Sequence, residues 1–219
     1  MAVLAALAGR LVVSCQPVTD GPMDDDAIVV ALARAAVAGG AAALRIEGAA
    51  RVAKVKAAVR VPVIGIVKRD LADSPVRITP WLADVDALAR AGADVIAVDA
   101  TARARPVPVE SLLAAIRSQG RLAMADASGE ADALAAHALG FDIIGTTLSG
   151  YVGGAVPSAP DVELIAALAG RVPRIMAEGR FHHPDDVRKA RAAGAWAVTV
   201  GTAITRVELV TKRFAEAMG

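Results

Sequence analysis

The sequence predicts a single α/β domain folded as a (β/α)8 TIM barrel, and three observations support this prediction. Eight apolar runs alternate with eight segments in which apolar residues recur at helical spacing. The repeat, counted from Gln16 to Gly201, has a mean length of about 26 residues, which accommodates one strand, one helix and two turns. Hydrophobic residues make up 55% of the chain and aromatic residues 3%, so Ala, Val, Leu and Ile fill the layers of the expected core.

The expected elements follow one another without a linker or a low-complexity stretch, so one domain should cover residues 1–219. Strands are expected at residues 11–16, 41–46, 61–67, 93–99, 121–125, 141–147, 172–178 and 195–201. Helices are expected at residues 24–38, 49–58, 79–91, 109–117, 130–139, 161–168, 184–193 and 206–218.

Capping residues mark where two of these helices should begin. Asp24, Asp25 and Asp26 precede the first helical segment, and their negative charge suits the positive N-terminus of a helix. Thr79 is expected to cap the third helix, with Pro80 at its first helical position.

The near-continuous apolar character of the strands indicates burial on both faces, as in a parallel sheet. Eight such strands separated by helices favour a closed barrel over an open sheet. An open, doubly wound nucleotide-binding sheet is the alternative, and it requires a Gly-x-Gly-x-x-Gly turn after the first strand. Residues 16–21 read QPVTDG and do not fit that turn, so the barrel is preferred.

Charge and hydropathy restrict the expected partners. The formal net charge is +1 and the Lys and Arg residues are scattered, which argues against a nucleic-acid partner. No apolar run reaches the roughly 18 residues of a membrane-spanning helix, so no membrane partner is expected. The expected partner is a small molecule.

The first residues and the single cysteine bear on location. Residues 1–10 are apolar enough to resemble a signal peptide, and residues 11–15 faintly resemble a lipoprotein cleavage site. No basic residue precedes the apolar run, however, and Arg10 interrupts it, so secretion is not favoured. Cys15 alone cannot form an intrachain disulfide, which suits a reducing compartment, and the cytoplasm is the expected location.

The candidate site is identified from the polar residues that follow the strands, because such barrels carry their chemistry at the carboxyl ends of the strands. A charged residue after a strand also occurs wherever a chain reaches water, so no single position is decisive. Together they should converge on one rim. The positions are Gln16, Arg45, Lys68, Asp99, Asp126, Thr147, Glu178 and Gly201-Thr202.

Lys68 and Glu178 are the acid–base candidates. They follow the third and seventh strands, which are four apart in an eight-stranded ring, so they should approach a substrate from opposite sides. A lysine acts as a base only when neutral, which requires desolvation or nearby cations such as Arg45 and Arg69 to lower its pKa. The alternative is that Lys68 only forms a rim salt bridge with Asp70, Asp99 or Asp126.

The loops after the last two strands suggest a phosphate site. Gly179 and Gly201 allow backbone N–H groups to approach an anion, Thr202 starts a short helix, and Arg206 adds a charged fork. The alternative is two ordinary glycine turns.

The three histidines do not suggest a metal site. His137 lies in a helix, His182 and His183 precede a helix-starting proline, and no Cys/His spacing resembles a zinc site, so we expect no metal.

The chain resembles a known family, the bacterial N-acylmannosamine-6-phosphate 2-epimerases. The resemblance extends over nearly the whole chain and its motifs are specific in combination. They are VSCQP at 13–17, LRIEG at 44–48, IGIVKRD at 64–70, RITP at 77–80, TLSGY at 147–151, AEGR at 177–180 and VGTAITR at 200–206.

The resemblance implies interconversion of N-acetylmannosamine 6-phosphate and N-acetylglucosamine 6-phosphate through an enolate, a step of sialic-acid and amino-sugar catabolism, with no nucleotide or metal cofactor. It implies that Lys68 is the principal acid–base residue and Glu178 its partner. Gln16, Arg45 and Asp126 would hold the sugar, with Thr147 beside them from the strand-end pattern. The family also suggests a homodimer.

For the phosphate, the resemblance implies Arg206 with the backbone at Gly179 and Gly201. The chain departs from the family pattern at residues 127–129, Ala-Ser-Gly where Ser-Thr is frequent, and at Val207, where proline is frequent. Neither departure touches a proposed catalytic position.

Two other functions fit the same residues. An aldolase of the same fold would use Lys68 as a Schiff-base amine, and a sensor would bind an amino-sugar phosphate without turnover. The loop at residues 149–160, at the expected catalytic rim, is a candidate lid.

Overall fold

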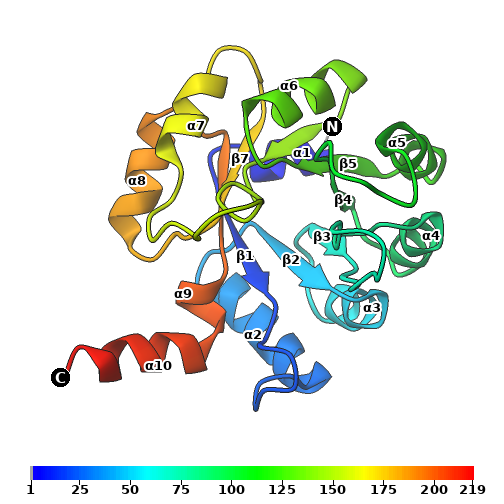
Figure 1. Ribbon diagram of the computed structural model, residues 1–219. Coiled ribbons are helices and arrows are strands. Elements are labelled where there is room, and N and C mark those ends of the chain that lie inside the picture. Colours follow the sequence, from blue (N-terminus) through cyan, green and yellow to red (C-terminus); the bar gives the residue numbers. More distant parts are fainter. Residues whose placement is uncertain (1) are drawn as a thin grey trace.

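The computed structural model describes residues 2–219 and confirms the predicted barrel (Figure 1). Eight parallel strands pair in sequence order, and β8 closes the ring on β1. The strands are β1 Leu11–Cys15, β2 Ala43–Glu47, β3 Val63–Ile66, β4 Val95–Asp99, β5 Leu122–Asp126, β6 Ile143–Gly145, β7 Ile175–Glu178 and β8 Ala197–Val200.

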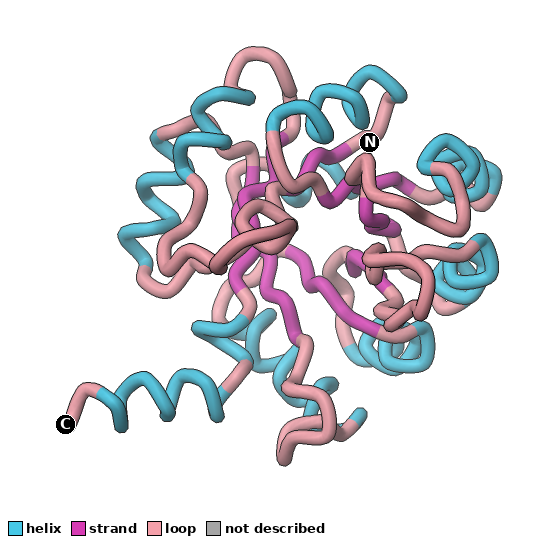
Figure 2. Tube along the Cα trace, viewed as in Figure 1, coloured by secondary structure: helices cyan, strands magenta, loops and turns pink. Residues whose placement is uncertain are grey.

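Most of the helices form an outer layer around the strands (Figure 2), whereas Leu7 of the first helix belongs to the interior core cluster. The helices are α1 Ala2–Leu7, α2 Asp26–Ala38, α3 Ala49–Ala58, α4 Leu82–Arg90, α5 Val109–Ser118, α6 Glu130–Leu139, α7 Val162–Leu168, α8 Pro184–Ala192, α9 Thr202–Thr205 and α10 Val207–Glu216. Within residues 2–219, none of these helices has the length and apolarity needed to cross a bilayer.

The alternation of side chains along each strand creates two cores. One set of residues faces the helices, and the other fills the barrel interior with small clusters of Val, Ile, Ala and Met. Ile64 and Ile66 of β3 belong to the interior cluster. The residue two positions further on is Lys68, so the same alternation carries its amine to the interior at the carboxyl end of β3.

The start of α2 agrees with the sequence, whereas the start of the third predicted helix does not. The Asp25 side chain accepts hydrogen bonds from the backbone of Ala27 and Ile28, as an N-cap does. Thr79 was expected to cap a helix, and this expectation is wrong. Its N–H donates to the Val67 carbonyl (2.7 Å), next to the bridge between Lys68 and Ile78, and α4 begins only at Leu82.

The last predicted helix, at residues 206–218, corresponds to α10, and the short helix expected to start at Thr202 corresponds to α9. The chain leaves helical geometry at Arg206, between α9 and α10, where the Arg206 Nε donates to the Gln16 carbonyl oxygen (2.9 Å). Helix α10 then runs away from the barrel, carrying the C-terminus with it (Figure 1). None of its residues is buried, and the Phe214 side chain is 74% exposed.

Candidate active site

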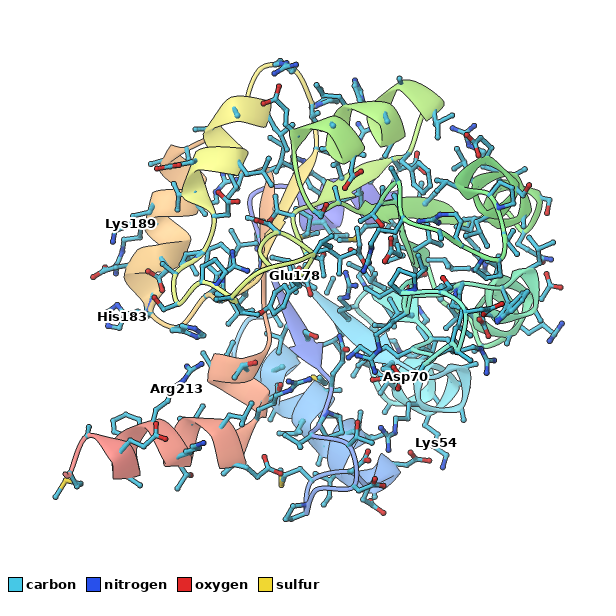
Figure 3. The ribbon with its side chains drawn as sticks, viewed as in Figure 1. Lys54, Asp70, Glu178, His183, Lys189 and Arg213 are labelled. Atoms are coloured by element: carbon cyan, nitrogen blue, oxygen red, sulfur yellow. The ribbon has the colours of Figure 1, made fainter. Side chains whose placement is uncertain are left out.

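A cavity of about 480 Å³ opens at the carboxyl ends of the strands. Glu178 lies near the centre of the ring when the barrel is viewed along its axis (Figure 3). The cavity brings together nine of the ten residues that the sequence singled out for substrate, phosphate or catalysis. They are Gln16, Arg45, Lys68, Thr147, Glu178, Gly179, Gly201, Thr202 and Arg206.

Asp126 is the tenth residue, and it lies beneath the cavity rather than in its wall. Its carboxylate is fully buried and forms two hydrogen bonds with the Arg45 guanidinium, at 2.6 and 3.1 Å. Thr147 donates a third hydrogen bond to it, at 2.6 Å. This arrangement supports an orienting role for Asp126, and a direct contact between Asp126 and sugar stays a prediction.

Arg45 links Asp126 to Glu178. From β2 its side chain crosses the barrel interior, and Nη1 donates to Oε2 of Glu178 at 3.0 Å. Charge-assisted pairs of this kind fix the orientation of both partners. No hydrogen bond within residues 2–219 uses the other carboxylate oxygen of Glu178, Oε1. Oε1 is therefore the atom of this carboxylate that is available to a ligand.

The environment of Glu178 favours its protonated form. Burial raises the pKa of the Glu178 carboxyl to about 7, and the nearby negative charge of Asp126 adds to this. Arg45, Thr147 and Lys68 oppose the rise. Since burial is the largest of these effects, Glu178 can exist in both protonation states near neutral pH, as an acid–base residue requires.

The environment of Lys68 also favours the neutral form, which for a lysine means a lowered pKa. Burial lowers the pKa of its ammonium group, and the positive charges of Arg206 and Arg45 lower it further. Glu47 opposes this shift, because its Oε2 lies 3.5 Å from the Lys68 Nζ. A lysine with a lowered pKa supplies more of the neutral amine that a base needs.

Lys68 does form a salt bridge, but its partner is Glu47 and not Asp70, Asp99 or Asp126 as expected. Asp70 pairs with Arg77 at 2.6 Å. Asp99 is buried and pairs with Arg103 and Arg105, at 2.6 and 3.2 Å. Together with the Asp126 contacts described above, this leaves Glu47 as the partner of Lys68 among the described residues.

The phosphate candidates lie side by side at the end of β7 and β8. Gly179 has φ +113, a conformation that residues with a Cβ rarely adopt. A Cβ at Gly201 would come within 3.2 Å of the Ser14 Cβ, so glycine keeps this wall open. The bond from the Arg206 Nε to the Gln16 carbonyl leaves its two Nη groups for an anion.

Arg180 is a residue whose structural importance the sequence did not reveal. Its guanidinium donates to the carbonyl oxygens of Ser149 and Ala159, and it lies 5.3 Å from the centre of the Tyr151 ring. It therefore fastens both ends of the loop at 149–160, which borders the cavity. Its position directly after Gly179 in the AEGR motif was the available signal.

Glu47 is the second residue that the sequence reading missed. It follows Arg45 by two positions in the LRIEG motif, so strand alternation places both on the same face of β2. The available signal was Ile46, the apolar residue between them, which indicates that Arg45 and Glu47 alternate with it along the strand. Within residues 2–219 there is no cluster of three His, Cys, Asp or Glu side chains suited to a metal ion.

Comparison with known proteins identifies the family. The family model NanE, described as "Putative N-acetylmannosamine-6-phosphate epimerase", matches residues 29–219. A "Putative N-acetylmannosamine-6-phosphate 2-epimerase" of Klebsiella pneumoniae (strain 342) is 58% identical over 200 residues, which cover 91% of this chain and 86% of the relative. A protein of the same description from Escherichia coli (strain K12 / DH10B) is 55% identical over 213 residues, covering 97% and 93%.

A solved structure agrees with these relatives. The N-acetylmannosamine-6-phosphate 2-epimerase from Clostridium perfringens superimposes with a TM-score of 0.93 at 40% identity, covering 98% of this chain and 95% of that chain. The motifs, the barrel and the relatives all lead to one conclusion: this chain belongs to the NanE family of N-acetylmannosamine-6-phosphate epimerases.

Proposed function

We propose that the protein inverts C2 of N-acetylmannosamine 6-phosphate to give N-acetylglucosamine 6-phosphate, which makes it an isomerase. The observation that carries this proposal is the pair formed by Lys68 and Glu178. They come from opposed strands, line one cavity, and have pKa values displaced toward each other by burial. Two such groups can exchange protons with opposite faces of one carbon near neutral pH.

The reaction starts with opening of the pyranose, because the C2 proton is acidic only when C1 is a carbonyl. Neutral Lys68 takes this proton, the C2–H bond breaks, and its electron pair moves onto the C1 oxygen as an enolate. Protonated Glu178 then delivers a proton from Oε1 to the opposite face of C2, and the ring closes on the inverted centre. In the reverse direction the two residues exchange roles. The guanidinium of Arg45 or the ammonium of Lys68 stabilises the enolate oxygen.

The phosphate is proposed to bind between Gly179, Gly201, Thr202 and Arg206. Backbone N–H groups and an arginine fork are a common combination for this ligand in such barrels. Gln16 and Thr147 also line the cavity, where sugar hydroxyls would reach them. The chemistry proposed here uses the protein's own side chains and no nucleotide or metal cofactor.

An assay with N-acetylmannosamine 6-phosphate beside the unphosphorylated sugar tests the proposal. We expect epimerisation of the phosphosugar, a much slower reaction of the free sugar, and loss of turnover in Lys68→Ala. Borohydride trapping of a covalent adduct would instead indicate a Schiff-base aldolase. Binding without turnover would indicate a sensor.

We further propose a homodimer in which helix α10 of each chain contacts the other. The helix has no buried residue and exposes Val207, Phe214 and, just beyond it, Met218, at 51%, 74% and 88%. Apolar side chains on a projecting helix favour burial against a second protein surface. A cytoplasmic site of action in sialic-acid catabolism is proposed from the sugar-phosphate substrate and the single buried, unpaired cysteine, Cys15.

A further inference from the structure

Glu47 lies beside the proposed base without belonging to the site described above. It is the last residue of β2, and its strand partner in the β2–β3 register is Ile66. Lys68 follows Ile66 by two positions, so both side chains are directed to the same side of the sheet. The Glu47 Oε2 and the Lys68 Nζ lie 3.5 Å apart, with the two side chains 29% and 27% exposed.

The pair is specific in its surroundings. The other acidic groups around Lys68 are already paired with arginines. Asp99 at the end of β4 pairs with Arg103 and Arg105, and Asp126 and Glu178 both pair with Arg45. Among the described residues, Glu47 forms no ion pair except the one with Lys68.

Other charged groups face the amine from several elements. Arg45 on β2 and Arg206 after β8 contribute positive charge, and Glu178 on β7 contributes negative charge when ionised. Arg77 and Asp70, which follow β3, neutralise each other.

Glu47 does not line the cavity, whereas Lys68 does. A substrate in the cavity would therefore meet the amine and not this carboxylate. The contact by which Glu47 can influence the reaction is its ion pair with Lys68. This distinguishes it from Glu178, which itself lines the cavity.

From this geometry we propose that Glu47 is a positioning residue, which holds the Lys68 amine toward C2 and stabilises its ammonium form after it has taken the proton. The inference rests on the proposed epimerase function. Each acid–base residue then has its own positioning residue: Arg45 orients Glu178, and Glu47 orients Lys68.

The electrostatics of Lys68 support this role. Burial and two arginines lower its pKa, and Glu47 is the largest opposing influence. Removing the carboxylate should therefore lower the pKa of Lys68 further. Where Lys68 takes the proton, the acid limb of the kcat/KM profile would move to lower pH. Where it donates the proton, the basic limb would move in the same direction.

The test compares Glu47→Gln and Glu47→Asp with the wild-type enzyme in both reaction directions across pH. The control is Glu130→Gln, which makes the same change in charge and breaks a surface pair with Arg171. For Glu47→Gln we expect a shift of roughly half a pH unit to lower pH, a several-fold loss of kcat, and an unchanged KM. Glu47→Asp should fall between Glu47→Gln and wild type, and the control should match wild type.

The shift should shrink in high salt, because the pair is partly exposed. A wild-type pH profile in Glu47→Gln would overturn the inference, whether kcat is reduced or not, and so would a raised KM with no shift. Inactive wild-type enzyme would instead overturn the proposed function, so the two failures are distinguishable. Equal thermal midpoints for the variants and wild type would show that the kinetic changes do not come from unfolding.

Discussion

The ion pair between Arg45 and Asp126 offers a test of the charge network beneath the cavity. Both side chains are almost completely buried, with contacts of 2.6 and 3.1 Å. Two unit charges about 4 Å apart attract each other by about 4 kcal/mol at an effective dielectric constant near 20. Arg45→Met removes this attraction and leaves the carboxylates of Asp126 and Glu178 buried without a cation. We expect it to lower the free energy of unfolding by about 3–5 kcal/mol.

Asp126→Asn and the double variant complete a double-mutant cycle with Arg45→Met. The amide oxygen of the new asparagine can still accept hydrogen bonds from Arg45 and Thr147. This substitution should cost about 1–3 kcal/mol. In the double variant both charges of the pair are absent, so the combined cost should fall short of the sum by about 1–3 kcal/mol. Urea denaturation of the four proteins at one pH measures this. Additive costs would refute the reasoning.

A surface pair provides the matched control for this cycle. Arg171 and Glu130 form an ion pair of 2.5 Å with both side chains about half exposed. The same cycle with Arg171→Met and Glu130→Gln should show a coupling below about 1 kcal/mol, because solvent screens exposed pairs.

Three further predictions concern pH, phosphate and assembly. Because the pKa of Glu178 rises from 4.5 to about 7 on folding, the unfolded chain releases a proton that the folded chain keeps. Stability should therefore fall as pH rises from about 4.5 to 7, and Glu178→Gln should flatten this dependence in urea titrations at the two pH values. Arg206→Met should raise KM for the phosphosugar at least tenfold, with little change for the free sugar in the same assay. Phe214→Asp should shift sedimentation toward a monomer, and an unchanged sedimentation coefficient would exclude α10 from the interface.

Much of the fold and the site followed from simple regularities in the sequence. Eight buried strands at even spacing predicted the barrel, and the residues that end them predicted which side chains share the cavity. Lys68 and Glu178 were found because a charged residue directly after an apolar strand is placed by the strand itself. Their relative position followed from the strand count, since a closed ring leaves no freedom in which strands oppose each other.

The errors arose where tertiary contacts override local signals. Thr79 and Pro80 resemble a helix start. Thr79 instead connects the chain after β3 to β4, because its hydroxyl donates to the Ala97 carbonyl at 2.7 Å. The hydrogen bond from the Arg206 side chain to the Gln16 carbonyl joins residues far apart in the sequence, so no local signal reveals it. The pairing of Lys68 with Glu47 depends on the register of β2 against β3, which residue types do not encode.

The proton transferred at C2 provides the most direct test of the central claim. The reaction is run in deuterium oxide with N-acetylmannosamine 6-phosphate, and NMR follows the C2 position of the N-acetylglucosamine 6-phosphate formed at early times. Opposed acid–base groups predict that the product carries deuterium at C2, and that Lys68→Ala gives neither product nor exchange. Product that keeps its original proton, or full exchange at C2 without Lys68, would contradict the account.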